Sequence, residues 1–234
     1  MNISLSPRLF ACSTFVKQGD RVADIGCDHG YLGIYLLLEG IAAAVIASDV
    51  KEGPLKSALL NSEKYGVKDK MSFFLSDGAR NIPRNFDVMV CAGMGADTIS
   101  SILDGAPWLK NDGYRLILQC QSKTAMLRQY LDQQGFSIRK EKVLRDGRFL
   151  YTVMEVIYQP EQIQRCSWEH HFPPALLEEQ TSEVREYYWQ ICTRLHRAVD
   201  GRGDRADAQT IQALQALTAL ADAPENSWLK EETV

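Results

Sequence analysis

Hydrophobic residues recur in short runs along the first part of the chain, with longer mixed segments between them. The runs lie at Val22–Ile25, Ala43–Ala47, Met71–Leu75, Phe86–Cys91 and Tyr114–Leu118. Strand-length runs separated by segments long enough for a helix are typical of βαβ units. The pattern therefore predicts an α/β fold with a parallel sheet that is covered by helices on both faces. Ligands are expected at the carboxyl ends of its strands.

A further pair of strand-like runs follows a helical segment predicted at Lys123–Gln133. Phe136–Leu144 and Phe149–Tyr158 flank the segment Arg145–Arg148, which contains an Asp-Gly dipeptide. Asp-Gly between two such runs is a strong signal for a β-hairpin. The sheet is therefore expected to close with an antiparallel pair of strands.

From about Pro160 the apolar residues follow helical spacing. One stripe contains Val184, Tyr188, Ile191, Leu195 and Val199, and a second contains Ile211, Leu214, Leu217 and either Leu220 or Ala221. The glycine-containing segment 201–204 separates the stripes, which predicts two helices joined by a tight turn and packed antiparallel. We therefore expect a main domain at 1–159 and a helical extension at 160–234. The extension braces the main domain, forms a dimer contact or helps to bind a substrate.

Composition and charge limit the classes of protein to which this chain can belong. The chain has 234 residues, of which 45% are hydrophobic, enough for one main core and a smaller one. Its formal net charge is −4, with the acidic excess in the extension, so a nucleic acid must bind a local basic surface. No apolar stretch is long enough to cross a membrane, and a cytoplasmic protein is expected. The 6 cysteines form no Cys-x-x-Cys pair, so neither a metal site nor a disulfide framework is predicted.

The segment Asp24–Leu32 combines the end of a strand, a glycine turn and the start of a helix. Gly26 and Gly30 allow a sharp turn and a close approach to a ligand, which is typical of a nucleotide-cofactor loop. Asp28 stands where dinucleotide loops favour a middle glycine. An acid there is unfavourable beside a pyrophosphate but suits the sulfonium and ammonium groups of S-adenosylmethionine. The alternative is an ordinary strand-turn-helix in which the glycines serve only the turn.

Two more aspartates follow the next predicted strands. Asp49 ends the second run, close to the spacing of about 20 residues at which an acid meets ribose hydroxyls, and Asp77 ends the third. An acid at the mouth of each of three successive strands suits an adenosine site, with one near the methionyl ammonium, one on the ribose and one near the adenine amino group. Each aspartate alone fits a helix cap or a turn equally well.

Four segments together resemble the bacterial tRNA adenine-22 N1-methyltransferases. They are Leu5–Leu9, Asp24–Leu32, Glu52–Leu55 and Gly93–Gly95, and the match runs over roughly residues 1–158 in order and spacing. The resemblance implies a Rossmann-like class I methyltransferase sheet with a C-terminal antiparallel helical hairpin. It also implies S-adenosyl-L-methionine as the cofactor and tRNA as the substrate, with a methyl group transferred to N1 of adenine at position 22.

The chain departs from this family at three places. Family members usually carry proline at the position of Gly33, glycine at that of Ala96, and proline-asparagine at Cys120-Gln121. The last two departures follow strands whose ends face the acceptor, so they bear on the substrate rather than the cofactor. A class I methyltransferase for another RNA, a protein or a small molecule is the alternative, followed by a non-catalytic Rossmann-like domain.

Adenine N1 carries a lone pair and no proton, so positioning can supply most of the rate and no general base is required. Asp28 and His29 are predicted at the reacting centre, although Asp28 could instead cap the next helix and His29 could hold the loop. The predicted cofactor residues are Asp24, Gly26, Cys27, Asp28, Gly30, Asp49, Val50, Asp77, Gly78, Ala92, Gly93 and Met94.

Substrate contacts are predicted from charge and from planar side chains. The target base must leave its stack to be methylated in a duplex, and Tyr31 and Met94 are the candidates to grip it, with Gly95 as a further substrate-binding residue. The phosphate-binding residues expected are Arg8 and the basic hairpin cluster of Arg139, Lys140, Lys142, Arg145 and Arg148. A solvated hairpin surface is the more common explanation of such a cluster.

Overall fold

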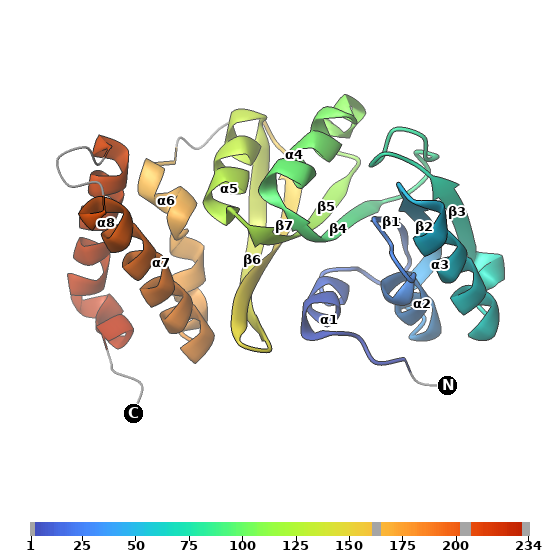
Figure 1. The fold of residues 1–234 in the computed structure, drawn as a ribbon, viewed down its shortest axis with the longest axis horizontal. Coiled ribbons are helices and arrows are strands. Elements are labelled where there is room, and N and C mark those ends of the chain that lie inside the picture. The colour runs from blue at the N-terminus through green and yellow to red at the C-terminus, as the bar shows by residue number, and fades with distance from the viewer. Residues whose placement is uncertain (1–2, 161–164, 202–206, 231–234) are drawn as a thin grey trace.

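One mixed sheet organises the chain (Figure 1), described in this computed structural model over residues 3–160, 165–201 and 207–230. Its seven strands are ordered β3-β2-β1-β4-β5-β7-β6. Their bounds are β1 (Asp20–Ile25), β2 (Ala42–Asp49), β3 (Met71–Leu75), β4 (Val88–Gly95), β5 (Arg115–Ser122), β6 (Phe136–Asp146) and β7 (Phe149–Tyr158). All neighbours are parallel except those of β7. The strand order reverses between β1 and β4, where open α/β sheets bind ligands.

Helices cover both faces of the sheet, as the pattern predicts. Figure 1 shows α4 (Ala96–Asp104) and α5 (Thr124–Gln133) above the sheet, and α1 (Pro7–Ser13) and α2 (Tyr31–Leu38) below it. α3 (Glu52–Lys64) shares the lower core. β4 divides its side chains by alternation, with Val88 and Val90 in the lower core and Met89 and Cys91 in the upper one.

The apolar pattern does not predict α1, which is too short to show a period. Its start is nevertheless encoded locally. The Ser6 side chain accepts a hydrogen bond from the Leu9 amide at 3.5 Å, and Pro7 occupies the first helical position. α1 lies against β4 to β7 and places Arg8 at the carboxyl end of the sheet.

The predicted hairpin is confirmed. Asp146 pairs with Phe149 across a turn in which Gly147 has a φ of 61°, the left-handed conformation that glycine adopts without strain. β3 and β7 have the predicted bounds. β2, β4 and β5 continue past their predicted ends. They extend toward the edge of the sheet formed by the carboxyl ends of the parallel strands, which we call the ligand edge because ligands are expected there.

The extension forms a third core against β6. It contains α6 (Ser167–His171), α7 (Ser182–Asp200) and α8 (Ala208–Asp222), with 3-10 segments at Pro174–Glu179 and Pro224–Lys230. The Tyr188 hydroxyl near the start of α7 donates to the Leu217 carbonyl late in α8 at 2.8 Å, so the helices are antiparallel as expected. Residues 202–204 of the predicted turn lie outside the described residues.

The stripe predicted on α8 is partly wrong. The buried positions are Ala213, Leu217 and Ala221, whereas Ile211 and Leu214 are only half-buried. Leu214 and Leu220 nevertheless pack against the core of the extension as partly buried residues, so the prediction misses Ala213 but holds at the leucines. The buried stripe of α7 also includes Tyr187 and Cys192.

A buried ion pair joins the extension to the sheet. Arg128 of α5 and Glu141 of β6 are each 1% exposed, with the closest nitrogen and oxygen 2.6 Å apart. The Arg128 guanidinium also donates to the His170 and His171 carbonyls at 2.7 and 3.0 Å and to the Tyr187 hydroxyl at 3.2 Å. The Arg128 side chain therefore connects α5, β6, α6 and α7.

None of the described helices is long and apolar enough to cross a membrane.

Candidate functional site

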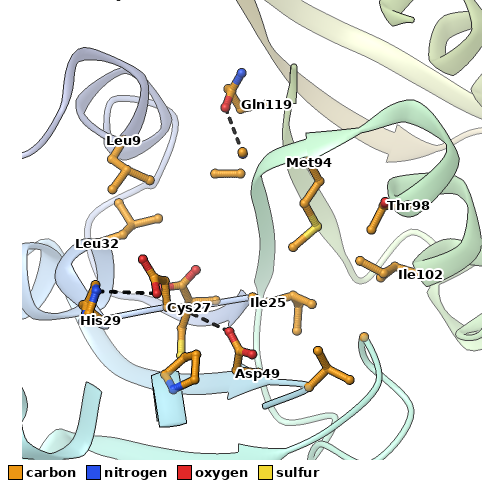
Figure 2. A pocket seen from close by; sticks show the side chains of 18 of the residues that line it. Leu9, Ile25, Cys27, His29, Leu32, Asp49, Met94, Thr98, Ile102 and Gln119 are labelled. Carbon is orange, nitrogen blue, oxygen red and sulfur yellow. Dashed lines mark hydrogen bonds and ion pairs between the residues drawn. The ribbon is translucent and has the colours of Figure 1, made fainter. Parts of the chain in front are cut away.

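A cavity of about 590 Å³ lies at the carboxyl ends of β1, β2 and β4, where the strand order reverses. That volume lies within the range of small-molecule sites. Figure 2 shows Leu9 and Leu32 on one side of it and Met94, Thr98 and Ile102 on the other. Its walls therefore come from both layers of helices and its floor from the strand ends.

The loop after β1 forms the floor. The amides of Gly26 and Cys27 both donate to the Ser48 carbonyl, at 2.8 and 2.9 Å. Gly26 has a φ of 71°, and a Cβ there would lie 2.3 Å from the Met94 methyl group. Asp28 also adopts a positive φ, 49°, which costs free energy for a residue with a side chain. This strained backbone folds tightly around a point where a ligand fits.

Asp24 presents a buried carboxyl to the cavity. It is 5% exposed and, within the part of the chain that the structure describes, receives no hydrogen bond and no ion pair. Burial, reinforced by the charge of Asp49, raises the pKa of Asp24 to about 7. A carboxyl held in this way binds a cation strongly, because the cation restores the stabilisation that water no longer provides.

Asp49, half-buried at the end of β2, organises the loop. Its carboxylate accepts hydrogen bonds from the Asp28 amide at 3.3 Å and from the Lys51 amide at 2.9 Å. Figure 2 shows the side chain directed at the loop beside Cys27. The carboxylate oxygens thus fix the neighbouring backbone while lining the cavity.

The loop after β3 is fixed from inside by Ser76, which no sequence pattern indicates. Its buried hydroxyl donates to the Gly78 carbonyl at 2.8 Å and accepts from the Asn81 amide at 3.1 Å. Asp77 is exposed beside this turn, with one carboxylate oxygen 3.7 Å from Nε of Arg80. Asp77 and Gly78 both line the cavity.

A bulge near the end of β4 shapes the opposite wall. The register with β5 shifts between Ala92 and Met94, and Gly93 between them has a φ of 79°. The fully buried Gln119 accepts a hydrogen bond from the Gly93 amide at 2.9 Å, as Figure 2 shows. Gln119 was not predicted, because its role depends on a cross-strand neighbour. It holds the bulge that directs Met94 over Gly26.

Asp28 and His29 meet at the rim of the cavity. Asp28 Oδ1 and His29 Nε2 are 3.7 Å apart, and the side chains are 71% and 50% exposed. The His29 ring lies 5.7 Å from the Tyr31 ring, centroid to centroid. The structure therefore brings the three predicted residues together, at the entrance rather than on the floor.

Nearly all of the predicted cofactor residues line the cavity. The exception is Gly30, where α2 begins with a φ of 72° and a Cβ would lie 2.9 Å from the Cβ of Ala58. Gly30 thus lets α3 approach α2. His29, predicted in a catalytic role only, also lines the cavity. The lining residues that were not predicted in any role are Ser6, Leu9, Ile25, Leu32, Lys51, Pro54, Ser76, Thr98, Ile102, Gln119 and Gln121.

The predicted substrate residues are not gathered into one surface. Arg8 lines the cavity, where its Nε lies 2.6 Å from Oδ2 of Asp146 and its guanidinium lies 5.4 Å from the centre of the Tyr151 ring. Tyr31 lines it as well. Gly95 does not, because it lies further along β4 beside Ser122.

The basic hairpin cluster is divided by the pleat of β6. Glu141 and Val143 are buried toward the extension, so Lys140 and Lys142 point to the opposite face. Arg145 faces the extension and forms an ion pair with Glu186 of α7. Arg148 lies over the Phe149 ring at 5.0 Å, and Arg139 is exposed near Gln159. The members of this cluster therefore do not share one face of β6, and their phosphate-binding role stays a prediction.

Known proteins match both the sequence and the structure. The chain is 31% identical over 153 residues to the tRNA (adenine(22)-N(1))-methyltransferase of Bacillus subtilis (strain 168), covering 65% of this chain and 64% of that protein. The chain thus spans just under two thirds of that curated relative. The B. subtilis M1A22 tRNA methyltransferase structure has a TM-score of 0.78 at 26% identity, covering 98% of each chain.

A third match includes a ligand. A candidate tRNA (m1A22) methyltransferase of Streptococcus pneumoniae, solved in complex with S-adenosyl-L-methionine, has a TM-score of 0.81 at 29% identity, covering 93% of this chain and 99% of the other. These matches confirm the resemblance and the Rossmann-like fold. The model of the methyltransferase domain matches residues 5–154, well over half of the sequence. The chain belongs to the methyltransferase domain family.

Proposed function

We propose that this protein is an S-adenosylmethionine-dependent tRNA methyltransferase that acts on N1 of adenine at position 22. The observation that carries the proposal is the cavity at the β1/β4 switch point, floored by a glycine loop with Asp28 at positive φ and by the buried Asp24 carboxyl, which has no partner among the described residues. Likeness to the B. subtilis tRNA methyltransferase supports the substrate, because it covers 98% of this chain and so includes the helical extension.

The three carboxyl groups at the strand ends fit a cationic nucleoside cofactor. Asp24 would face the methionyl ammonium, Asp49 would accept from the ribose hydroxyls, and Asp77 would lie near the adenine amino group. Bound S-adenosylmethionine supplies a methyl group made electrophilic by its sulfonium. A nicotinamide dinucleotide fits less well, because its pyrophosphate would meet Asp28 where the loop comes closest.

The acceptor requires orientation rather than deprotonation. Adenine N1 offers a lone pair, so the new N–CH3 bond forms as the S–CH3 bond breaks and its electron pair returns to sulfur. No proton leaves the acceptor atom. The chain must therefore align the base with the methyl group and exclude water, tasks that positioning alone accomplishes.

Several residues suit the task of holding the base. Met94 lies over Gly26 on the floor, and Tyr31 and His29 offer planar surfaces at the rim. A base that has left its stack is gripped by such apolar and planar groups. We assign Asp28 and His29 to the reacting centre, where Asp28 favours the positive charge that moves from sulfur to the methylated ring.

Mass spectrometry of nucleosides tests the proposal. Unmodified tRNA transcripts are incubated with the protein and S-adenosylmethionine carrying a deuterated methyl group, then digested. The expected product is labelled 1-methyladenosine, with Asp24→Asn as the matched control that retains the shape of the side chain but loses its charge. Label in 6-methyladenosine, or in no nucleoside at all, would contradict the proposal.

A further inference from the structure

A second, smaller groove lies beside the main cavity. It encloses about 170 Å³ between the end of β5, the start of α5, β7 and α7. Gln121 lines both the cavity and the groove, so the two hollows adjoin at this side chain. The groove thus leads from the proposed methyl-transfer centre toward the helical extension.

The residues that line the groove are polar or basic rather than acidic. They include Ser122, Thr124, Tyr151 and Gln190, although the Gln190 amide already donates to a carboxylate oxygen of Glu186 at 3.1 Å. That composition is notable in a chain with 30 acidic and 26 basic residues. Hydroxyls, amides and cations without a competing acid are the groups that bind phosphate oxygens.

Arg194 supplies the charge of the groove. Tyr187, Gln190, Ile191 and Arg194 follow one face of α7, which is the face directed at the groove. Across residues 3–160, 165–201 and 207–230, no hydrogen bond or ion pair engages Arg194. The other cation of the groove is Lys123, whose Nζ lies 2.7 Å from Oδ2 of Asp97, so its charge already has a counter-ion.

We infer that this groove is a subsite for a phosphodiester group next to the target nucleotide, with Arg194 as its cationic ligand. The inference rests on the proposed function. A base inserted in the main cavity carries its own backbone to the rim, and Gln121 is the side chain that this cavity shares with the groove. The neighbouring groove receives the adjoining phosphate and so gives the otherwise acidic extension a direct role in RNA binding.

A pair of variants on the same helix tests the subsite. Arg194→Gln removes the charge from the groove, whereas Arg197→Gln removes an exposed charge one turn further on, outside the groove. Arg194→Gln should weaken tRNA binding by about tenfold or more, the range for a hydrogen bond to a charged group. It should also reduce the log-log salt slope by about 0.7 to 0.9, the value for one phosphate. Both variants should bind S-adenosylhomocysteine as the unaltered protein does.

Single neutral linkages locate the phosphate. A methylphosphonate placed on either side of the target nucleotide should weaken binding by the unaltered protein at one of the two positions. At that position it should cost the Arg194→Gln variant nothing more, because the contact is already absent. Additive losses at both positions, or equal behaviour of the two arginine variants, would overturn the subsite while leaving the function intact. Failure of the unaltered protein to bind or methylate tRNA would overturn both.

Discussion

Two buried charges in this structure, one at the carboxyl end of the central strand β1 and one beside the edge strand β6, differ in whether the protein supplies partners for them. At the ligand edge, Asp24 is buried without a partner among the described residues, and its pKa rises to about 7. At the β6 edge, Arg128 is equally buried but donates to a carboxylate, two carbonyls and a hydroxyl. The compensated charge of Arg128 holds the extension against the sheet. The uncompensated carboxylate of Asp24 lowers stability when it is ionised, and we explain its presence by the proposed binding of a cationic ligand.

This difference distinguishes a buried charge that supports the fold from a buried charge that can bind a ligand. A buried charge with every donor used offers nothing to a ligand, and removing its partner damages the fold. A buried carboxyl that faces a cavity has acceptor capacity left over, and perturbation of its pKa is typical of functional sites. The predictions below act on one edge at a time.

The largest effect is expected at the β6 edge. Arg128→Met leaves Glu141 buried and uncompensated, which should lower the free energy of unfolding by about 3 to 5 kcal/mol. Urea unfolding at neutral pH measures the change. The extension should become sensitive to proteolysis before the sheet does.

A double variant provides the control. Arg128→Met combined with Glu141→Leu removes both charges and should recover most of the lost stability, since no charge remains buried alone. If the double variant were as unstable as Arg128→Met, the loss would come from packing and carbonyl contacts, and the contrast between the two edges would weaken.

At the ligand edge, Asp24→Asn should reduce S-adenosylhomocysteine affinity by at least about 3 kcal/mol, the upper end for hydrogen bonds to a charged group. Calorimetry measures it. Because Asp24 of the free protein has a pKa of about 7, affinity of the unaltered protein should fall as the pH drops below 7. Retention of that pH dependence in Asp24→Asn would assign it to another group.

The same variant should raise stability. Burial raises the folded-state pKa of Asp24 above its ordinary value of 3.8, so its contribution to stability is complete below pH 4 and is lost as the pH rises to about 7. The slope reaches at most about 1.4 kcal/mol per pH unit. Asp24→Asn should therefore be more stable than the unaltered protein at pH 8 and similar to it at pH 4. Equal stability at both pH values would show that the carboxyl is solvated.

A smaller loss is expected at Asp49. Asp49→Ala should weaken S-adenosylhomocysteine binding by about 1.5 to 3 kcal/mol, because it removes the proposed ribose acceptor and frees the Asp28 and Lys51 amides. The exposed Asp112→Ala serves as the matched control. Unchanged affinity would remove Asp49 from the ribose role.

The smallest effect concerns the hairpin. Lys140 and Lys142 share the face of β6 that points away from the extension, so neutralising both should flatten the salt dependence of tRNA binding by up to about two log-log units without affecting the cofactor. The exposed pair Lys64 and Lys70 provides the comparison. An unaltered salt slope would leave these lysines as a solvated surface.

Local chemistry made much of the ligand edge predictable. Gly26 and the three strand-ending aspartates are specified by turn geometry and strand ends, features that lie within a few residues of one another. The hairpin at Gly147 and the bounds of β3 and β7 follow from the same kind of signal. The division at 1–159 and 160–234 stays a prediction.

Long-range partners account for what the sequence did not reveal. Gln119 acts on Gly93 across a strand pair, and Glu141 meets Arg128 only after β6 docks beside α5. Neither pair has a spacing that marks it. The phosphate-binding role of the basic hairpin cluster stays a prediction, and alternation along β6 sends neighbouring members to opposite faces. The stripe on α8 was partly wrong, because Ala213 is buried beside Leu217 and Ala221 whereas Ile211 is only half-buried.

The position of the methylated base tests the proposed function most directly. Two tRNA transcripts that differ only at position 22, with adenine in one and guanine in the other, are incubated with the full chain and labelled S-adenosylmethionine. We predict stoichiometric transfer to the adenine transcript, with the label in 1-methyladenosine at position 22, and none to the other. Equal transfer to both transcripts would contradict the proposed function.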